Sequence, residues 1–143
     1  MPHAERRVTI RRPVDEVYRY IASGEHQAEW RPAVMSIKLR SGRDGEAGAV
    51  YEQKIKGPMG RAVPADYEIT SAIPNKELRF RALAGPVRPE GYYLFESSGE
   101  GTTVTFGMDC QPSGLARLMT PMVAKAMDGE VACIDNVKSN LER

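Results

Sequence analysis

Apolar residues near the carboxyl end of the chain recur with the spacing of one helix face. They occupy positions i, i+3, i+4, i+7, i+8, i+11 and i+12: Leu115, Leu118, Met119, Met122, Val123, Ala126 and Met127. A narrower stripe continues through Val131, Ile134, Val137 and Leu141. This pattern predicts an amphipathic helix over residues 114–141, about 40 Å long. Pro121 predicts a kink or a restart of this helix near Thr120.

The first third of the chain predicts one strand followed by two short helices. Alternation over residues 3–12 indicates the strand, which Pro13 ends. Apolar residues from Val14 to Ala22 then share one helical face, and Gly24 follows as a stop signal. A second short helix over residues 25–30 is expected to end before Pro32.

Between residues 34 and 110, turn signals separate runs of alternating polar and apolar residues. The clearest run places Val104, Phe106 and Met108 on one face and threonines on the other. Short turns between successive runs predict an antiparallel meander with one dry face. Six strands are expected, over residues 34–40, 49–56, 62–71, 77–83, 92–97 and 102–110.

The composition narrows the class of protein. A length of 143 residues predicts a single domain over residues 1–143, and a net charge of +1 gives no signal for nucleic acid or an anionic surface. No apolar run is long enough to span a membrane, and the first residues do not resemble a secretion signal. Two cysteines argue against a disulfide framework, so a cytoplasmic location is expected.

Several short motifs, in order along the chain, resemble one known superfamily. They are Pro-Val-Asp-Glu-Val-Tyr at 13–18, Trp-Arg-Pro at 30–32, Tyr-Glu-Ile at 67–69 followed by Pro74 and Leu-Arg-Phe at 78–80, Gly-Thr-Thr-Val-Thr at 101–105, and Gly-Leu-Ala-Arg-Leu-Met at 114–119 with Pro121. The chain is similar to the START/Bet v 1-like superfamily (SRPBCC), of the bacterial polyketide cyclase/dehydrase and lipid-transport type.

The resemblance implies an α+β helix-grip fold. A curved antiparallel sheet of about seven strands, in the order β-α-α-β6-α, would surround the long C-terminal helix. Relatives hold hydrophobic small molecules in a cavity between the sheet and that helix. Here the candidate cavity residues combine the apolar strand faces with the helix stripe: Tyr51, Gln53, Tyr67, Phe80, Tyr93, Phe106, Met108, Met119, Met122, Met127 and Glu130. Ordinary core packing is the alternative for each tyrosine and methionine.

Glu130 is the one candidate for acid–base chemistry. A helical wheel places it within the arc of Met127 and Ile134, so its carboxylate would face the sheet or the cavity. Desolvation there would favour a role as acid or base. The alternatives are an exposed helix end or an ion pair with an arginine. The two histidines, His3 and His26, lie in polar surroundings and are expected to be surface residues.

Three hypotheses about function remain open at this stage. The first is binding or transport of a hydrophobic or aromatic small molecule, with the loops 56–61 and 84–91 as candidate lids. The second is a polyketide cyclase-like or dehydratase-like enzyme that uses Glu130 and a tyrosine. The third is a protein-interaction module. No metal-ligand spacing occurs, so neither metal nor cofactor is expected, and the protein is expected to be a monomer or a homodimer without nucleic acid or integral membrane association.

Overall fold

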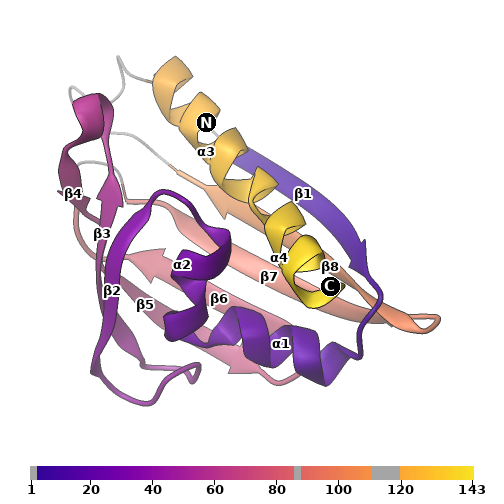
Figure 1. Cartoon of the computed structure of the whole chain (residues 1–143). Coiled ribbons are helices and arrows are strands. Elements are labelled where there is room, and N and C mark those ends of the chain that lie inside the picture. Colours follow the sequence, from indigo (N-terminus) through magenta and orange to yellow (C-terminus); the bar gives the residue numbers. More distant parts are fainter. Residues whose placement is uncertain (1–2, 86–87, 111–119) are drawn as a thin grey trace.

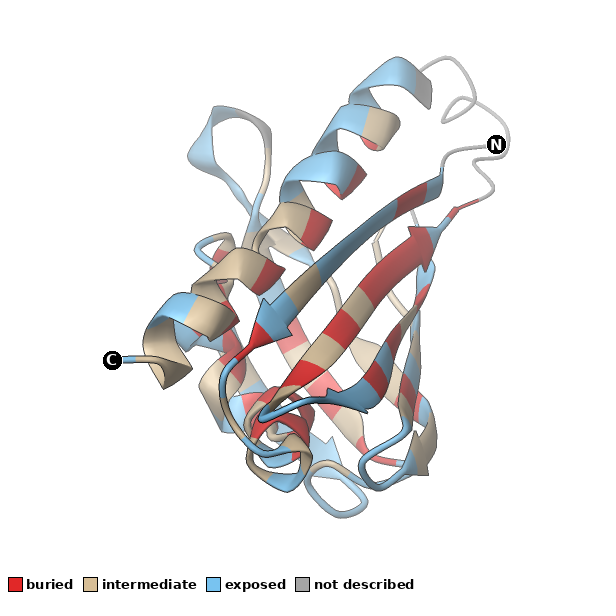
Figure 2. Cartoon of the chain, turned by 90° about the vertical axis from the view of Figure 1, so that its right-hand side faces the viewer, coloured by how far each residue is buried: buried red, intermediate tan, exposed pale blue. Residues whose placement is uncertain are grey.

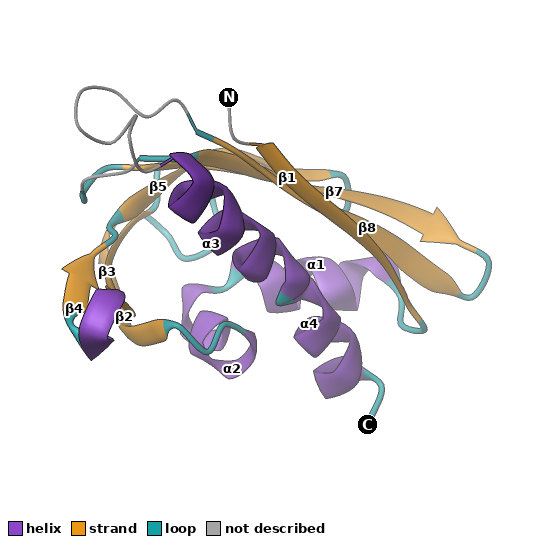
Figure 3. Cartoon of the chain, turned by 90° about the horizontal axis from the view of Figure 1, so that it is seen from above, coloured by secondary structure: helices purple, strands orange, loops and turns teal. Residues whose placement is uncertain are grey.

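The computed structural model describes residues 3–85, 88–110 and 120–143. All helices lie on one side of a curved antiparallel sheet (Figures 1 and 3). The elements are β1 (His3–Ile10), α1 (Val14–Ala22), the 3₁₀ turn η1 (Gly24–His26), α2 (Gln27–Trp30), β2 (Val34–Ser41), β3 (Val50–Lys56), the 3₁₀ turn η2 (Pro58–Gly60), β4 (Ala62–Pro64), β5 (Tyr67–Ile73), β6 (Glu77–Ala82), β7 (Glu90–Ser98), β8 (Gly101–Asp109), α3 (Thr120–Ala132) and α4 (Ile134–Leu141).

The sheet has eight strands, in the order β1-β8-β7-β6-β5-β3-β2, with β4 paired to β3 beside this path. This arrangement, with a C-terminal helical segment across the concave face, confirms the predicted α+β helix-grip fold. The expected run over 62–71 divides into β4 and β5, which raises the number of strands from about seven to eight. Pro64 has no N–H for a ladder, and the carboxylate of Asp66 accepts the backbone N–H of Gln53 at 3.1 Å, so the ladder is interrupted there.

The predicted C-terminal helix is interrupted at Cys133 within the described residues. The Cys133 N–H donates to the Glu130 carbonyl, and the Asn136 N–H to the Cys133 carbonyl. Both bonds span three residues instead of four, which tightens the backbone between α3 and α4. The predicted segment 114–119 lies outside the described residues, and α3 begins at Thr120.

The dry core lies where α1, α2 and α4 meet the sheet. Trp30, Ile21, Val104, Ile134 and Val137 are all fully buried. Figure 2 shows buried positions alternating with exposed ones along the strands, and the buried side of α3 and α4 turned toward the sheet. An amide hydrogen of Asn136 binds the Trp30 carbonyl at 3.0 Å, which ties α4 to α2. Packing is therefore tight at the α4 end of the fold.

Asp44 holds the loop between β2 and β3 against the end of α1. Its carboxylate accepts the Ser23 hydroxyl at 2.7 Å, the Gly24 N–H at 2.8 Å and the Tyr51 hydroxyl at 2.5 Å. Burial alone would raise the pKa of Asp44, but the Tyr51 hydrogen bond, followed by those from Gly24 and Ser23, lowers it below the ordinary value of 3.8. The ionised carboxylate is thus the stabilising form.

We expect this contribution to stability to disappear at low pH. Because the folded-state pKa is lowered, the contribution is fully present above about pH 4 and is lost as the pH falls through the folded-state pKa. At neutral pH Asp44→Ala should lose about 1 kcal/mol, a modest amount because Asp44 is exposed and water screens it. Urea unfolding between pH 2 and 7 should show this difference shrinking in acid. The exposed Asp128 serves as the control: Asp128→Ala should follow wild type, and an Asp44→Ala deficit that persists at the lowest pH would contradict the assignment.

Candidate functional site

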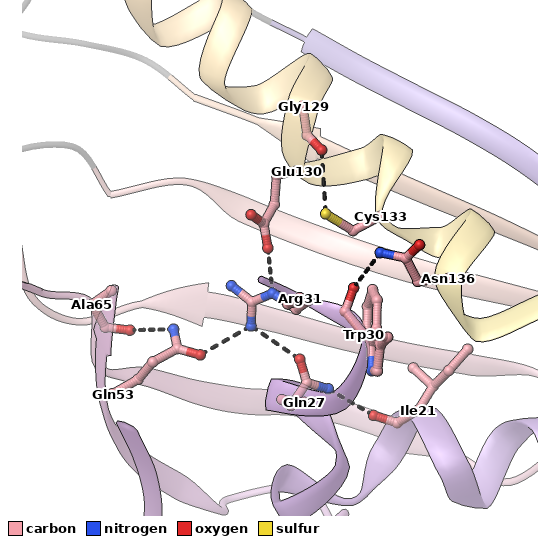
Figure 4. Close-up of polar contacts among 10 residues, drawn as sticks. All are labelled: Ile21, Gln27, Trp30, Arg31, Gln53, Ala65, Gly129, Glu130, Cys133 and Asn136. Carbon is pink, nitrogen blue, oxygen red and sulfur yellow. Dashed lines mark hydrogen bonds and ion pairs between the residues drawn. The ribbon is translucent and has the colours of Figure 1, made fainter. Parts of the chain in front are cut away.

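Arg31 is directed into the fold by the residues on either side of it. Helix α2 ends at Trp30, whose ring is fully buried. Pro32 follows, and a residue before proline is displaced from helical to extended geometry. Arg31 accordingly has φ −114° and ψ 93°. Its side chain lies between α2, β3 and α3 (Figure 4).

The guanidinium of Arg31 joins three elements through charged and amide groups. Its Nε donates to the Glu130 carboxylate on α3. Its Nη1 donates to the amide oxygens of Gln27 and Gln53, each at 2.9 Å. Gln27 comes from α2 and Gln53 from β3. We call these four residues, Gln27, Arg31, Gln53 and Glu130, the Arg31 cluster.

Both glutamines are fixed by backbone carbonyls, so their oxygens face Arg31. The Gln27 amide nitrogen donates to the Ile21 carbonyl at 2.9 Å, and that of Gln53 donates to the Ala65 carbonyl at 3.0 Å (Figure 4). Each amide therefore uses its donor on the main chain and offers its acceptor to the guanidinium. Both side chains are buried, at 4% and 3% exposure.

The ion pair keeps Arg31 charged in a nearly dry environment. The side chains of Arg31 and Glu130 are 13% and 18% exposed. Burial, the largest single influence, lowers the pKa of Arg31, but the charge of Glu130, together with Tyr93, Tyr67 and the Glu130 hydrogen bond, leaves the pKa raised above its ordinary value. The pair as a whole adds no net charge to the site.

A cavity of about 520 Å³ opens next to the Arg31 cluster, between the concave sheet and α3. All four cluster residues line it. Most of the residues proposed from the sequence also lie on its wall: Gln53, Tyr67, Phe80, Tyr93, Phe106, Met108, Met122, Met127 and Glu130. Their role in binding stays a prediction. Met119 lies outside the described residues.

Tyr51 is placed differently from the other tyrosines proposed from the sequence. It is not among the residues that line the cavity. Its hydroxyl donates to Asp44 and accepts the Gly45 N–H at 2.8 Å, while its ring stacks on Tyr67 at a centroid distance of 4.9 Å. Tyr51 thus packs against the ring of Tyr67, which lines the cavity. The Tyr51 hydroxyl already has hydrogen-bond partners in Asp44 and Gly45.

Aromatic rings form one wall of the cavity. Tyr93 stacks on Phe106 with centroids 4.4 Å apart, and Phe80 lies 5.8 Å from Tyr93 and 6.0 Å from Tyr67. Phe80 can take this position only because its strand neighbour is Gly91: a Cβ there would stand 2.2 Å from the Phe80 ring. This wall suits a flat, apolar ligand.

Three hydrogen-bond donors at the polar end of the cavity have no partner among the described residues. They are Nη2 of Arg31 and the hydroxyls of Tyr67 and Tyr93. Burial raises the pKa of both tyrosines well above the ordinary value, and the nearby charge of Arg31 only partly opposes this. Both hydroxyls therefore stay protonated and can donate. Such a set can hold an oxygen atom of a bound molecule.

Sequence reasoning missed Arg31 and Gln27 as site residues. Arg31 belongs to the Trp-Arg-Pro motif at 30–32, which contributes to the family resemblance, but that resemblance assigned Arg31 no role in a site. The signal that was available is local: an arginine between a buried tryptophan and a proline cannot continue the helix. That it meets Glu130, 99 residues later in the chain, depends on tertiary packing.

The two loops proposed as lids both border the cavity. Lys56 and Gly57 line it from the β3–β4 hairpin, and Ala84, Gly85 and Pro89 line it from the β6–β7 connection. Lid movement stays a prediction.

Within residues 3–85, 88–110 and 120–143, no cluster of three or more His, Cys, Asp or Glu side chains is arranged for a metal ion. No helix in these ranges is both long enough and apolar enough to cross a membrane.

Solved structures with the same architecture span nearly the whole chain. TTHA0849 from Thermus thermophilus is similar over 96% of this chain and 95% of its own, with a TM-score of 0.76 and 22% identity. Ara h 8.0201 is similar over 99% and 98%, with a TM-score of 0.72 and 14% identity. The di-domain ARO/CYC StfQ from the steffimycin biosynthetic pathway has a TM-score of 0.78 and 14% identity over 96% of this chain and 50% of its own. At these identities the likeness shows the fold.

A curved sheet that grips a C-terminal helix over a cavity defines the START/Bet v 1-like superfamily (SRPBCC), to which the protein belongs. Residues 1–142 match the model of one family within it, described as polyketide cyclase / dehydrase and lipid transport. The chain is a member of that family. A comparison with curated proteins found no match.

Proposed function

We propose that this protein binds a neutral, largely aromatic small molecule that carries a carbonyl or phenol oxygen, and that the oxygen lies against the Arg31 cluster. The observation that carries the proposal is the group of unpartnered donors at one end of an otherwise apolar cavity. Arg31, Tyr67 and Tyr93 line the same space, and the charge of Arg31 acts on both tyrosine hydroxyls. A purely apolar ligand would leave these donors unsatisfied, which costs free energy.

The charge balance of the site favours a neutral ligand over an anion. Glu130 already compensates Arg31, and a carboxylate ligand would bring a second negative charge close to Glu130. A carbonyl or phenol oxygen accepts the same hydrogen bonds without that repulsion. The aromatic wall of Phe80, Tyr93 and Phe106 supplies a surface for the rest of the molecule.

The first test is native mass spectrometry of the protein purified from its own host, followed by denaturation to release any bound compound. A stoichiometric neutral aromatic molecule would support the proposal directly. A bound aliphatic anion would contradict the proposed ligand class.

A second test uses a defined probe, because Trp30 is the one tryptophan and its ring meets the cavity residues Tyr93 and Phe106. We expect 1,8-dihydroxyanthraquinone to quench Trp30 fluorescence and to bind at least about tenfold more tightly than anthracene, which has no oxygen. Tyr93→Phe should weaken the quinone by about tenfold and leave anthracene unchanged. The matched control is Tyr92→Phe, since Tyr92 donates to Glu5 away from the cavity. Equal effects of the two variants would contradict the proposal.

A cyclase-like or dehydratase-like enzyme is the second candidate. Glu130, Tyr67 and Tyr93 line the same cavity, and the similar structures include ARO/CYC proteins. The variant Glu130→Gln distinguishes the enzyme from the binding protein. Loss of turnover of a poly-carbonyl substrate with unchanged affinity would favour the enzyme. The 520 Å³ cavity favours both over a protein-interaction module, which would need no such space. One domain over residues 1–143, a cytoplasmic location and a monomeric or homodimeric state remain predictions.

A further inference from the structure

The ring of Phe80 leans over the neighbouring strand because that strand offers a glycine beneath it. Phe80 on β6 pairs directly with Gly91 on β7, so both residues belong to the concave face of the sheet. A Cβ at Gly91 would stand less than 3.0 Å from Cζ, Cε1 and Cε2, the atoms at the far tip of the ring. The tip of Phe80 therefore rests directly on the backbone of Gly91.

The open side of the Phe80 ring faces the cavity. Phe80 lines the cavity and is only partly buried, whereas Gly91 is buried and does not line it. Three other rings of the aromatic wall surround it, with centroids 6.0 Å away in Tyr67, 5.8 Å in Tyr93 and 6.4 Å in Phe106. These rings occupy its flanks and the sheet lies below. A ring displaced from Gly91 would therefore move into the cavity.

The aromatic wall is wide enough for several fused rings. Tyr67, Phe80, Tyr93 and Phe106 come from the adjacent strands β5, β6, β7 and β8. Neighbouring strands lie about 4.8 Å apart, so the wall extends roughly 14 Å across the sheet. A molecule with three fused rings in a row covers most of this width, including Phe80. A single ring covers a small part of it and can shift along the wall.

We propose that Gly91 is a specificity-determining residue of the binding site: by letting Phe80 lean away from the cavity, it leaves the depth that a flat, fused-ring ligand needs. Carbon atoms pack at about 3.5–4.0 Å, so a side chain at residue 91 would raise the ring tip by about 1 Å or more. A rigid, flat ligand cannot follow this step and loses contact with the rings on either side. This role rests on the proposed binding function, and it concerns the shape of the ligand rather than its oxygen.

The test compares Gly91→Ala with Gly107→Ala, a matched control from the next strand. Gly107 on β8 pairs with Tyr92 on β7, and a Cβ at Gly107 would also stand less than 3.0 Å from three atoms of the tyrosine side chain. Neither Tyr92 nor Gly107 lines the cavity. Neither glycine has a positive φ, so alanine is compatible with both backbones. The two variants introduce the same kind of clash, one beneath the cavity and the other away from it.

We expect Gly91→Ala to bind 1,8-dihydroxyanthraquinone and anthracene at least about tenfold more weakly than wild type, as measured by quenching of Trp30 fluorescence. Binding of 2-hydroxyacetophenone, which carries a hydroxyl and a carbonyl on a single ring, should change by less than about twofold. Gly107→Ala should bind all three probes like wild type, although urea unfolding should show a loss of stability in both variants. The proposal is overturned if Gly91→Ala binds anthracene like wild type, or if it weakens the single-ring probe equally.

Phe80→Leu shows whether Gly91 acts through the Phe80 ring. Leucine has no atoms where the ring tip meets Gly91. In the Phe80→Leu background, Gly91→Ala should therefore change the affinity for anthracene by less than about twofold, against at least about tenfold in the wild-type background. A tenfold loss in both backgrounds would overturn the proposal.

Phe80→Leu alone tests the same point without a substitution at Gly91, should Gly91→Ala fail to fold. Removing the ring tip deepens the cavity, so the preference for flat anthracene over the folded 9,10-dihydroanthracene should fall at least about threefold. An unchanged preference would contradict the role of Phe80 and Gly91. The proposed function fails separately, if wild type binds the quinone no better than anthracene. The loss of anthracene affinity in Gly91→Ala does not depend on that result, because anthracene has no oxygen.

Discussion

Glu130→Leu is expected to destabilise the protein by about 3 kcal/mol, because it leaves the guanidinium of Arg31 buried without a counter-charge. We expect the lower end of the range for broken buried pairs, since both side chains retain some exposure to the cavity. The free energy of unfolding in urea measures the loss.

The double variant Arg31→Met/Glu130→Leu distinguishes an unpaired charge from simple loss of packing. With both charges removed, most of the stability should return, although the Gln27 and Gln53 amide oxygens lose their partner. If the double variant is as unstable as the sum of the two single variants, the ion pair is not the cause. Ligand binding should remain impaired in the double variant, because Nη2 of Arg31 is gone.

Trp30→Ala is expected to cost about 4 kcal/mol, the largest effect of a single substitution that we predict. The ring is fully buried and meets Tyr93 and Phe106 edge-on, at centroid distances of 6.2 and 6.1 Å. Because Trp30 immediately precedes Arg31, the cavity left behind also loosens the Arg31 cluster. Thermal unfolding followed by circular dichroism measures the loss without relying on tryptophan fluorescence.

Trp30→Phe is the matched control for this substitution. The indole N–H of Trp30 has no hydrogen-bond partner among the described residues, so phenylalanine gives up volume but no hydrogen bond. We expect a loss below about 2 kcal/mol. A loss as large as that of alanine would mean that the indole nitrogen has a partner.

The strand faces and the helix stripe were predictable because they depend on local periodicity. Alternation in residues 102–110 placed Phe106 and Met108 on the buried face, and the helical wheel turned Glu130 inward. The break at Pro64 was missed because the alternation before and after it resembles that of one strand. The break at Cys133 has no comparable signal, since it arises within a continuous helical pattern.

The candidate site was predictable only in part, because it is assembled from distant segments. Glu130 was predicted to face the sheet or the cavity, with an exposed helix end or an ion pair with an arginine as the alternatives. In the structure Glu130 lines the cavity and also pairs with Arg31. The partner, Arg31, comes from a short helix whose orientation the periodicity does not determine. The sequence also could not show that Tyr67 lines the cavity whereas Tyr51 does not. The Tyr51 hydroxyl binds Asp44, which lies on a loop whose course no sequence pattern predicts.

Among the described residues the curved sheet does not close into a barrel, so β1 and β2 are its two edge strands. An exposed edge strand can pair edge-to-edge with a strand of another chain, which leads to aggregation. Two register shifts interrupt β2, between Val34 and Ser36 and between Leu39 and Ser41, and Lys38 and Arg40 project along it. Another chain would therefore meet an irregular, charged strand. The β2 edge is thus a poor template for pairing with a strand of another chain.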